Sequence, residues 1–198
     1  MLYSIETSGV VYSDNFIQQW SGNYQAHNAG SVNRIWKQEP GRDGVLQLQA
    51  NNGYNSIRHN PNSLYVDNRK LMVEAEIAIA KNTGNQSFFI GLMDKHLGEL
   101  PQANGIYLEG TTTDNQWRAY SYKNSVLIDS GVVGELVANN IFQHLSIEIG
   151  IGYAVVKIDG NELDLTVSNG FSCGLLFGLT NSGVSWPSLL LDWVKISR

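Results

Sequence analysis

Charged residues are scarce in this chain. Asp, Glu, Lys and Arg make up only 16% of its 198 residues, against about 25% in an average soluble domain. The net charge is −5, and no run of Lys or Arg occurs. Because binding to duplex nucleic acid needs a cationic surface, we expect no nucleic-acid partner. Solubility must then come from neutral polar side chains, and such a surface suits neutral polar partners such as sugars.

Cysteine pairs, long apolar runs and a secretory signal are also missing. A single cysteine, Cys173, excludes an internal disulfide. No apolar stretch approaches the roughly 18 residues that a membrane-spanning helix needs, so we expect no membrane insertion. The first residues, MLYSIETSGVVYSD, have neither a cationic start nor an apolar centre, so they predict no signal peptide. These absences predict a soluble protein that is not secreted.

Apolar and polar residues alternate along most of the chain. The segments 71–80, 143–151 and 163–167 each carry an apolar side chain at every second position. Successive side chains of a β-strand point to opposite faces, so this period predicts strands with one buried face. No segment has the longer period of an amphipathic helix over a comparable length. The pattern therefore favours an all-β fold.

Turn dipeptides fall between the alternating segments. Asp159–Gly160 predicts a tight hairpin and Asn52–Gly53 predicts another turn, because Gly and Asn tolerate the positive φ that such turns need. The chain is long enough to build a core without a disulfide or metal. We therefore predict a two-sheet antiparallel sandwich as a single domain over residues 15–198. Residues 1–14 are predicted to be an N-terminal arm or a first strand.

The segments of the second half follow a recognisable order. They are FFIGLMD (88–94), NGIYLEG (104–110), WRAYSYKN (117–124), YAVVKIDGNEL (153–163) and LLLDWVKISR (189–198). This order resembles the concanavalin A-like lectin/glucanase jelly roll, and more narrowly the LamG-like domains of phage structural proteins. With similar segments in the first half, the resemblance covers nearly the whole chain. It implies a jelly-roll fold.

The resemblance also raises the possibility of glycoside hydrolysis. The glucanases of this family carry carboxylates on one strand in the pattern Glu-x-Asp-x-Glu or Glu-x-Asp-x-x-Glu. Residues two apart on a strand lie about 7 Å apart on one face, as paired catalytic carboxylates require. This chain has Glu74-x-Glu76 and Glu162-x-Asp164, and neither continues into the full pattern. The catalytic roles of the family cannot be carried over.

A further strand places His144, Ser146 and Glu148 on one face, a spacing that invites a hydrolase interpretation. No G-x-S-x-G motif surrounds Ser146, however, and polar residues are ordinary on a solvated strand face. We therefore expect no catalytic residues and no enzyme, with a glycoside hydrolase as the alternative.

Metal ligands are sparse as well. The four histidines are scattered, with no spacing typical of a zinc site. Calcium binds to oxygen ligands from loops, and lectin-like sandwiches often hold it. Asp94 and Asn104 are the calcium candidates. Because Asp and Asn are also common turn residues, the alternative is that they only shape the loops.

Sugar binding needs an exposed aromatic ring with hydrogen-bonding groups beside it. Polar residues directly precede one tryptophan, and other aromatics lie in Asn-rich or Ser-rich segments. The candidate sugar-binding residues are Trp117, Tyr120, Tyr122, Tyr54, Trp186, Asp114 and Asn115. The alternative is that the large aromatics fill the core of the sandwich.

The sequence thus favours a protein that presents a binding surface. The resemblance implies a phage virion component, such as a capsid decoration protein, a fibre or a receptor-binding module, located on the virion surface. Its partners would be glycans or other virion proteins, and a homo-trimer is one assembly that fits. The alternative is a free glycan-binding lectin or carbohydrate-binding module.

Overall fold

In the residues that the computed structural model describes, all regular structure is β-strand. The structure describes residues 10–14, 24–37, 40–42, 44–59, 64–66, 70–80, 85–95, 104–137, 140–168, 170–183 and 185–198. The strands are β1 (Val10–Asp14), β2 (Tyr24–Lys37), β3 (Val45–His59), β4 (Leu64–Val66), β5 (Leu71–Ala80), β6 (Gln86–Met93), β7 (Gly105–Thr111), β8 (Gln116–Lys123), β9 (Val126–Glu135), β10 (Phe142–Ile149), β11 (Tyr153–Ile158), β12 (Asn161–Thr166), β13 (Phe171–Asn181) and β14 (Ser188–Ser197). In the described part of the chain, no helix is long and apolar enough to cross a membrane.

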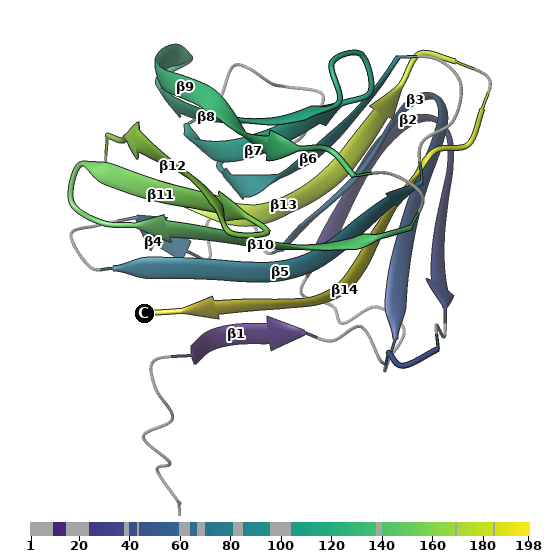
Figure 1. Cartoon of the computed structure of the whole chain (residues 1–198), viewed down its shortest axis with the longest axis horizontal. Helices are drawn as coiled ribbons and strands as arrows, with labels where there is room; N and C mark the ends of the chain where they lie inside the picture. The colour runs from purple at the N-terminus through teal and green to yellow at the C-terminus, as the bar shows by residue number, and fades with distance from the viewer. Residues whose placement is uncertain are drawn as a thin grey trace, which may run out of the picture.

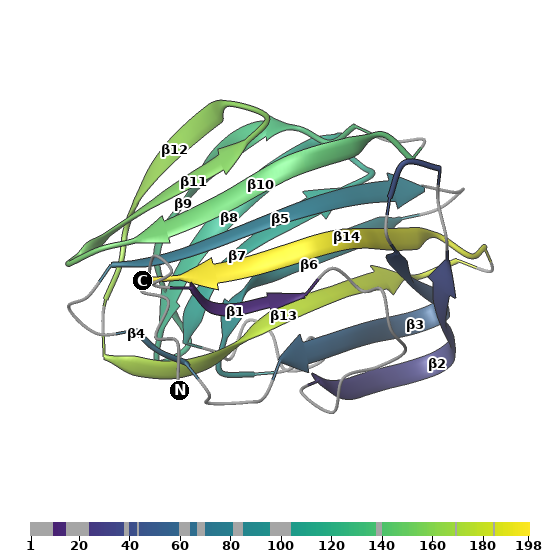
Figure 2. The ribbon, with the colours of Figure 1, turned by 90° about the horizontal axis from the view of Figure 1, so that it is seen from below.

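The strands form one antiparallel sheet that folds over into two layers. Their order is β12-β11-β10-β5-β14-β3-β13-β6-β7-β8-β9, with β1 on β14, β2 on β3 and β4 on β13. The fold-over occurs along β3, because residues 46–49 pair with β14 and residues 53–58 pair with β13. We call β5, β10, β11, β12 and β14 the back layer, and β6, β7, β8, β9 and β13 the front layer (Figures 1 and 2). The prediction of an all-β jelly-roll sandwich is confirmed.

The apolar positions of the alternating segments meet between the two layers. In β5, every second side chain from Leu71 to Ile79 is at most 1% exposed. Burying one such side chain contributes about 1.5–3 kcal/mol, so the core holds the layers together. Its largest fully buried side chains include Trp117, Phe88, Phe177, Leu48 and Ile57.

Of the two predicted turns, one is confirmed and one is wrong. Asp159 and Gly160 join β11 to β12 with φ of 48° and 85°. At Asn52–Gly53, however, β3 continues without reversing and pairs with β2 on both sides of a bulge. A Cβ at Gly53 would lie 2.0 Å from the carbonyl oxygen of Ala29. The glycine therefore permits a close approach of two strands at the bulge instead of a chain reversal.

The segment predicted as an arm or first strand contributes to the sheet. β1 pairs antiparallel with β14, with residues 10–14 facing residues 194–197. Residues 1–9 of the predicted arm lie outside the described residues.

Candidate functional site

A row of hydroxyl groups crosses the outer face of the front layer near one end of its strands. Thr180 of β13 pairs with Ser87 of β6, which pairs with Thr111 of β7. Cross-strand partners point to the same face and lie about 5 Å apart. Tyr54 of β3 extends the row on the far side of Thr180. Four neighbouring strands, β3, β13, β6 and β7, thus offer hydroxyl side chains side by side.

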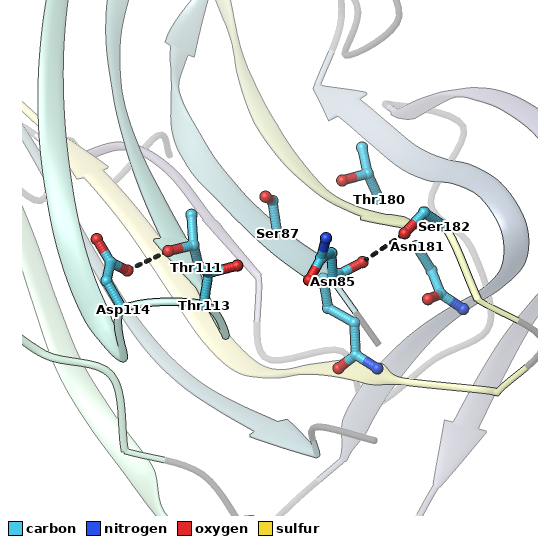
Figure 3. Close-up of a pocket in the computed structure, with 9 residues that line it drawn as sticks. Asn85, Ser87, Thr111, Thr113, Asp114, Thr180, Asn181 and Ser182 are labelled. Atoms are coloured by element: carbon cyan, nitrogen blue, oxygen red, sulfur yellow. Dashed lines mark hydrogen bonds between the residues drawn. The ribbon is translucent and has the colours of Figure 1, made fainter. Parts of the chain in front are cut away.

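Loops on both sides of this row close a pocket of about 410 Å³. Figure 3 shows Asp114 and Thr113 at one margin, with Asn181 and Ser182 at the other. Each lining residue carries a hydroxyl, amide or carboxylate group. The full set is Asn85, Gln86, Ser87, Thr111, Thr113, Asp114, Thr180, Asn181 and Ser182. We call this the hydroxyl pocket.

Hydrogen bonds fix both walls of the hydroxyl pocket. The Thr111 hydroxyl donates to the Asp114 carboxylate, and this bond lowers the pKa of Asp114. On the other wall, the Ser182 hydroxyl donates to the backbone carbonyl of Asn85 at 3.3 Å. Asn181 Nδ2 donates to the carbonyl of Ser185 at 2.7 Å. The pocket is therefore formed before any ligand arrives.

The next row of the same face contains a single acid. Glu109 lies between Phe89 and Arg118 in the sheet register. Burial raises its pKa, and a hydrogen bond with Ser87 only partly offsets that effect. Glu109 thus lies between the hydroxyl row and the centre of the outer face.

Farther along the face lies a tyrosine cluster of Tyr107, Tyr120 and Tyr122. The ring of Tyr107 stacks on those of Tyr120 and Tyr122, with centroids 5.1 and 6.0 Å apart. Burial raises the pKa of the Tyr107 hydroxyl, which belongs to a ring only 4% exposed. Tyr107 is four residues from Thr111, or about 13 Å along β7. The predicted sugar contacts Tyr120 and Tyr122 therefore share a face with the hydroxyl pocket but do not line it.

The prediction that Trp117 contacts a sugar is wrong. Trp117 is 0% exposed and lies between the layers, where its Nε1 donates to Oε1 of Gln143 at 3.0 Å. Alternation places it on the inner face with Ala119, also 0% exposed. Of the polar residues before it, Asp114 and Asn115 belong to the β7–β8 turn and Gln116 begins β8, and they do not bring the indole to the surface.

The other candidates are spread over the same end of the molecule. Asp114 lines the hydroxyl pocket, whereas Asn115 is an exposed turn residue with φ of 54°. Tyr54 is half-buried, and its hydroxyl lies 3.2 Å from Nδ1 of His27. Trp186, 37% exposed, lies in the β13–β14 connection and does not line the pocket.

Sequence reasoning missed Ser87, Thr111 and Thr180. Each is an ordinary polar residue near a strand end, and only the register of β13, β6 and β7 brings them together. Without knowledge of which strands pair, the sequence gives no indication that these three residues form a row.

The two calcium candidates lie together and are joined by hydrogen bonds. The backbone N and Nδ2 of Asn104 donate to Oδ1 and Oδ2 of Asp94, both at 2.7 Å. The Asn104 Oδ1 accepts a bond from the backbone N of Asn124 at 2.7 Å. No group of three or more His, Cys, Asp or Glu side chains that could hold a metal occurs in the part of the chain that the structure describes. Calcium binding at Asp94 stays a prediction.

Most of the acids behind the hydrolase alternatives lie in ion pairs on the outer face of the back layer. Each carboxylate has a Lys or Arg within 3.5 Å, so its charge is matched by a surface cation. The pairs are Glu74–Lys195 (3.5 Å), Glu76–Arg42 (2.6 Å), Glu148–Lys70 (2.8 Å) and Glu162–Lys157 (2.5 Å).

Comparison with known proteins rests on structure. No protein-family model and no curated protein matches the sequence. The structure is similar to a prokaryotic β-1,3-1,4-glucanase (lichenase) derived from a mouse hindgut metagenome, with a TM-score of 0.68 and 14% identity over 94% of this chain and 98% of that one. It is similar to a Bacillus licheniformis β-glucanase, with a TM-score of 0.67 and 16% identity over 98% and 100%. The exoplasmic/lumenal domain of VIP36, bound to Ca²⁺ and Man3GlcNAc, has a TM-score of 0.64 and 10% identity over 91% and 85%.

This chain has the concanavalin A-like lectin/glucanase fold. The fold implied by the order of segments is thereby confirmed. Because glucanases and a glycan-bound domain share this fold, the fold alone decides neither catalysis nor binding.

Proposed function

We propose that this chain is a non-catalytic carbohydrate-binding domain and that the hydroxyl pocket is its site. The observation that carries the proposal is the row of Thr180, Ser87 and Thr111, which opens into a preformed pocket with Asp114 at its margin. Its volume of about 410 Å³ falls within the range of about 300–1,000 Å³ typical of small-molecule sites.

The chemistry of the lining suits a sugar. Hydroxyl and amide groups both donate and accept hydrogen bonds, so they can replace the water around sugar hydroxyls. Asp114 is a carboxylate at neutral pH, as an ordinary aspartate is, and its hydrogen bond with Thr111 lowers its pKa further; it can accept hydrogen bonds from sugar hydroxyls. Every residue of the lining carries a hydrogen-bonding group, and this favours ligands with many hydroxyl groups.

The acids near the hydroxyl pocket do not follow the glucanase pattern, and this supports binding without hydrolysis. The outer face of β7 carries Glu109 between Tyr107 and Thr111, whereas the glucanase pattern places several carboxylates on one strand. Asp114, in the turn after β7, is close enough for its charge to raise the pKa of Glu109, so these two acids are the pair that a hydrolysis assay must test.

A glycan array followed by calorimetric titration tests the proposal. Asp114→Asn and Thr180→Val should each weaken binding of the array's best ligand by about tenfold, the equivalent of 1.4 kcal/mol. Glu74→Gln, a matched carboxylate change on the back layer, should leave binding unchanged. The proposal fails if no glycan binds, or if both pocket variants bind like the wild type.

Hydrolysis of mixed-linkage β-glucan, measured by release of reducing ends, separates the enzyme alternative. We expect no turnover. Turnover that is abolished by Glu109→Gln would establish a glycosidase in place of a lectin.

We further propose that this domain is displayed on a phage virion, which rests on the sequence resemblance alone. β1 belongs to the sheet, so an arm for neighbouring subunits is confined to the residues before Val10. A trimer in light scattering that becomes a folded monomer on deletion of residues 1–9 is the expected result. A monomeric full-length chain, or assembly unaffected by the deletion, contradicts it.

A further inference from the structure

A second pocket, of about 460 Å³, lies where the two ends of the sheet order meet. β9 and β12 are the end strands of the order, and they contact each other without pairing (Figures 1 and 2). The pocket is lined by side chains from β9, β11 and β12, among them Asp129, Tyr153, Asp164 and Thr166. We call it the seam pocket.

Asp129 fixes the geometry of the seam. Its Oδ2 accepts a hydrogen bond from the backbone N of Thr166, and its Oδ1 accepts one from the backbone N of Ser130, both at 2.8 Å. One carboxylate thus ties β12 to β9 where no strand ladder does. The wall of the seam pocket is therefore set by the fold.

Tyr153 supplies an aromatic platform. A Cβ at Gly150 would lie 2.3 Å from the Tyr153 ring, so the ring rests against the backbone of a residue without a side chain. The same tyrosine is 43% exposed. The ring is thus held against Gly150 while part of the side chain stays open to solvent.

Hydrogen-bonding groups lie beside this platform. Thr166 is the cross-strand partner of Tyr153, and Asp164 lies two residues earlier on the same face of β12, where both are exposed. No hydrogen bond or ion pair with another described residue engages the Asp164 carboxylate. An open ring, a hydroxyl that also bonds to Asp129, and a carboxylate whose charge interacts with Lys157 therefore line one pocket.

We propose that the seam pocket is a second glycan-binding site, in which a neutral sugar ring stacks on Tyr153 while its hydroxyls bond to Asp164 and Thr166. The apolar C–H face of a sugar packs on an aromatic ring, and its equatorial hydroxyls point outward to acceptors. The carboxylates of Asp129 and Asp164 repel acidic sugars, so the ligand class is neutral.

The two pockets lie on different parts of the sheet. The hydroxyl pocket surrounds Thr180, Ser87 and Thr111 on β13, β6 and β7, whereas the seam pocket is lined mainly by β11 and β12 of the back layer, with Asp129 from β9. The two sets of lining residues do not overlap, so binding at each pocket can be followed separately.

Amide NMR of the full ¹⁵N-labelled chain tests this inference, since it reports on each pocket separately. The probes are cellotetraose, laminaritetraose and mannotetraose, each added to 10 mM. We expect one of them to shift the amide signals of Gly152, Tyr153 and Thr166 along a saturating curve, separately from those of Ser87 and Thr111.

Variants then identify the groups involved. Tyr153→Ala should weaken binding at the seam by about tenfold and leave the hydroxyl pocket unaffected, whereas Tyr153→Phe should retain binding because it keeps the ring. Tyr65→Ala, at a tyrosine of β4 that is 49% exposed, is the matched control and should change nothing.

The outcomes separate this inference from the proposed function. Saturation at the seam with a silent hydroxyl pocket supports the second site and refutes the first. Saturation only at the hydroxyl pocket, equal affinity of Tyr153→Ala and wild type, or silence of both pockets overturns the second site.

Discussion

Replacing Trp117 tests whether this residue serves the core or a ligand. Its indole is fully buried, and a Cβ on the facing Gly110 would lie 2.9 Å from the ring. Trp→Ala in such a position removes the transfer free energy of the ring and leaves a cavity, a loss of about 3–5 kcal/mol. For a domain of this size, 1 kcal/mol shifts Tm by about 2–4 °C. We therefore expect Trp117→Ala to lower Tm by about 10 °C.

Trp117→Phe divides this loss into packing and hydrogen bonding. The phenyl ring fills much of the space but cannot donate to Gln143 Oε1. That oxygen still accepts a bond from the backbone N of Val137 at 3.1 Å, so it is not left unpaired. We expect a loss of about 1–2 kcal/mol, at the lower end of core substitutions.

Thermal and urea unfolding followed by circular dichroism measure both losses, with sugar titrations run in parallel. Trp186→Ala is the matched control, because a tryptophan that is 37% exposed should cost less than about 1 kcal/mol. A Trp117→Ala protein that melts within 2 °C of the wild type yet no longer binds sugar would falsify the assignment of Trp117 to the core.

Three further predictions follow from the charges and the thiol. Burial raises the pKa of Glu109, so ionisation of this carboxyl group destabilises the fold as pH rises. Glu109→Gln should therefore raise Tm at pH 8 and hardly change it at pH 4, and a larger increase in Tm at pH 4 than at pH 8 would contradict this reasoning. Arg42 forms ion pairs with both Glu76 and Asp192. Arg42→Met should lower the free energy of unfolding in urea by about 1 kcal/mol and by less in 1 M NaCl, and a loss of stability that does not depend on salt would speak against a charge effect. Cys173 is buried, and burial raises its pKa to about 12. A thiol reagent at pH 8 should therefore label Cys173 only when the chain is unfolded in urea, and rapid labelling of the folded chain would contradict this prediction.

The alternation of side chains carries the predictable part of this fold. The pattern of residues 71–80 predicts a strand with one buried face, and β5 has these bounds and buries every second residue from Leu71 to Ile79, although Ala78 of the other face is buried as well. The prediction is robust because a shift by one residue would expose the whole apolar set. The Asn52–Gly53 dipeptide was less informative, since a positive φ serves a bulge as well as a turn.

The two pockets were harder to predict, because each depends on pairing or contact between distant strands. Alternation correctly separates Trp117 from Tyr120 on opposite faces of β8, but a single strand does not show which face meets the core. Likewise, Asp129 and Thr166 are 37 positions apart, and no local sequence pattern predicts that their strands meet. Predicting the pockets would therefore require the pairing and register of strands that are distant in the sequence.

The position of β14 has a consequence for how this chain folds. Last of the strands in chain order, it lies between β5 and β3 and also pairs with β1. Until its residues have left the ribosome, β5 and β3 each present a row of unsatisfied amides and carbonyls to the cell. Such edges invite association between nascent chains. A shortened chain that lacks β14 should therefore aggregate.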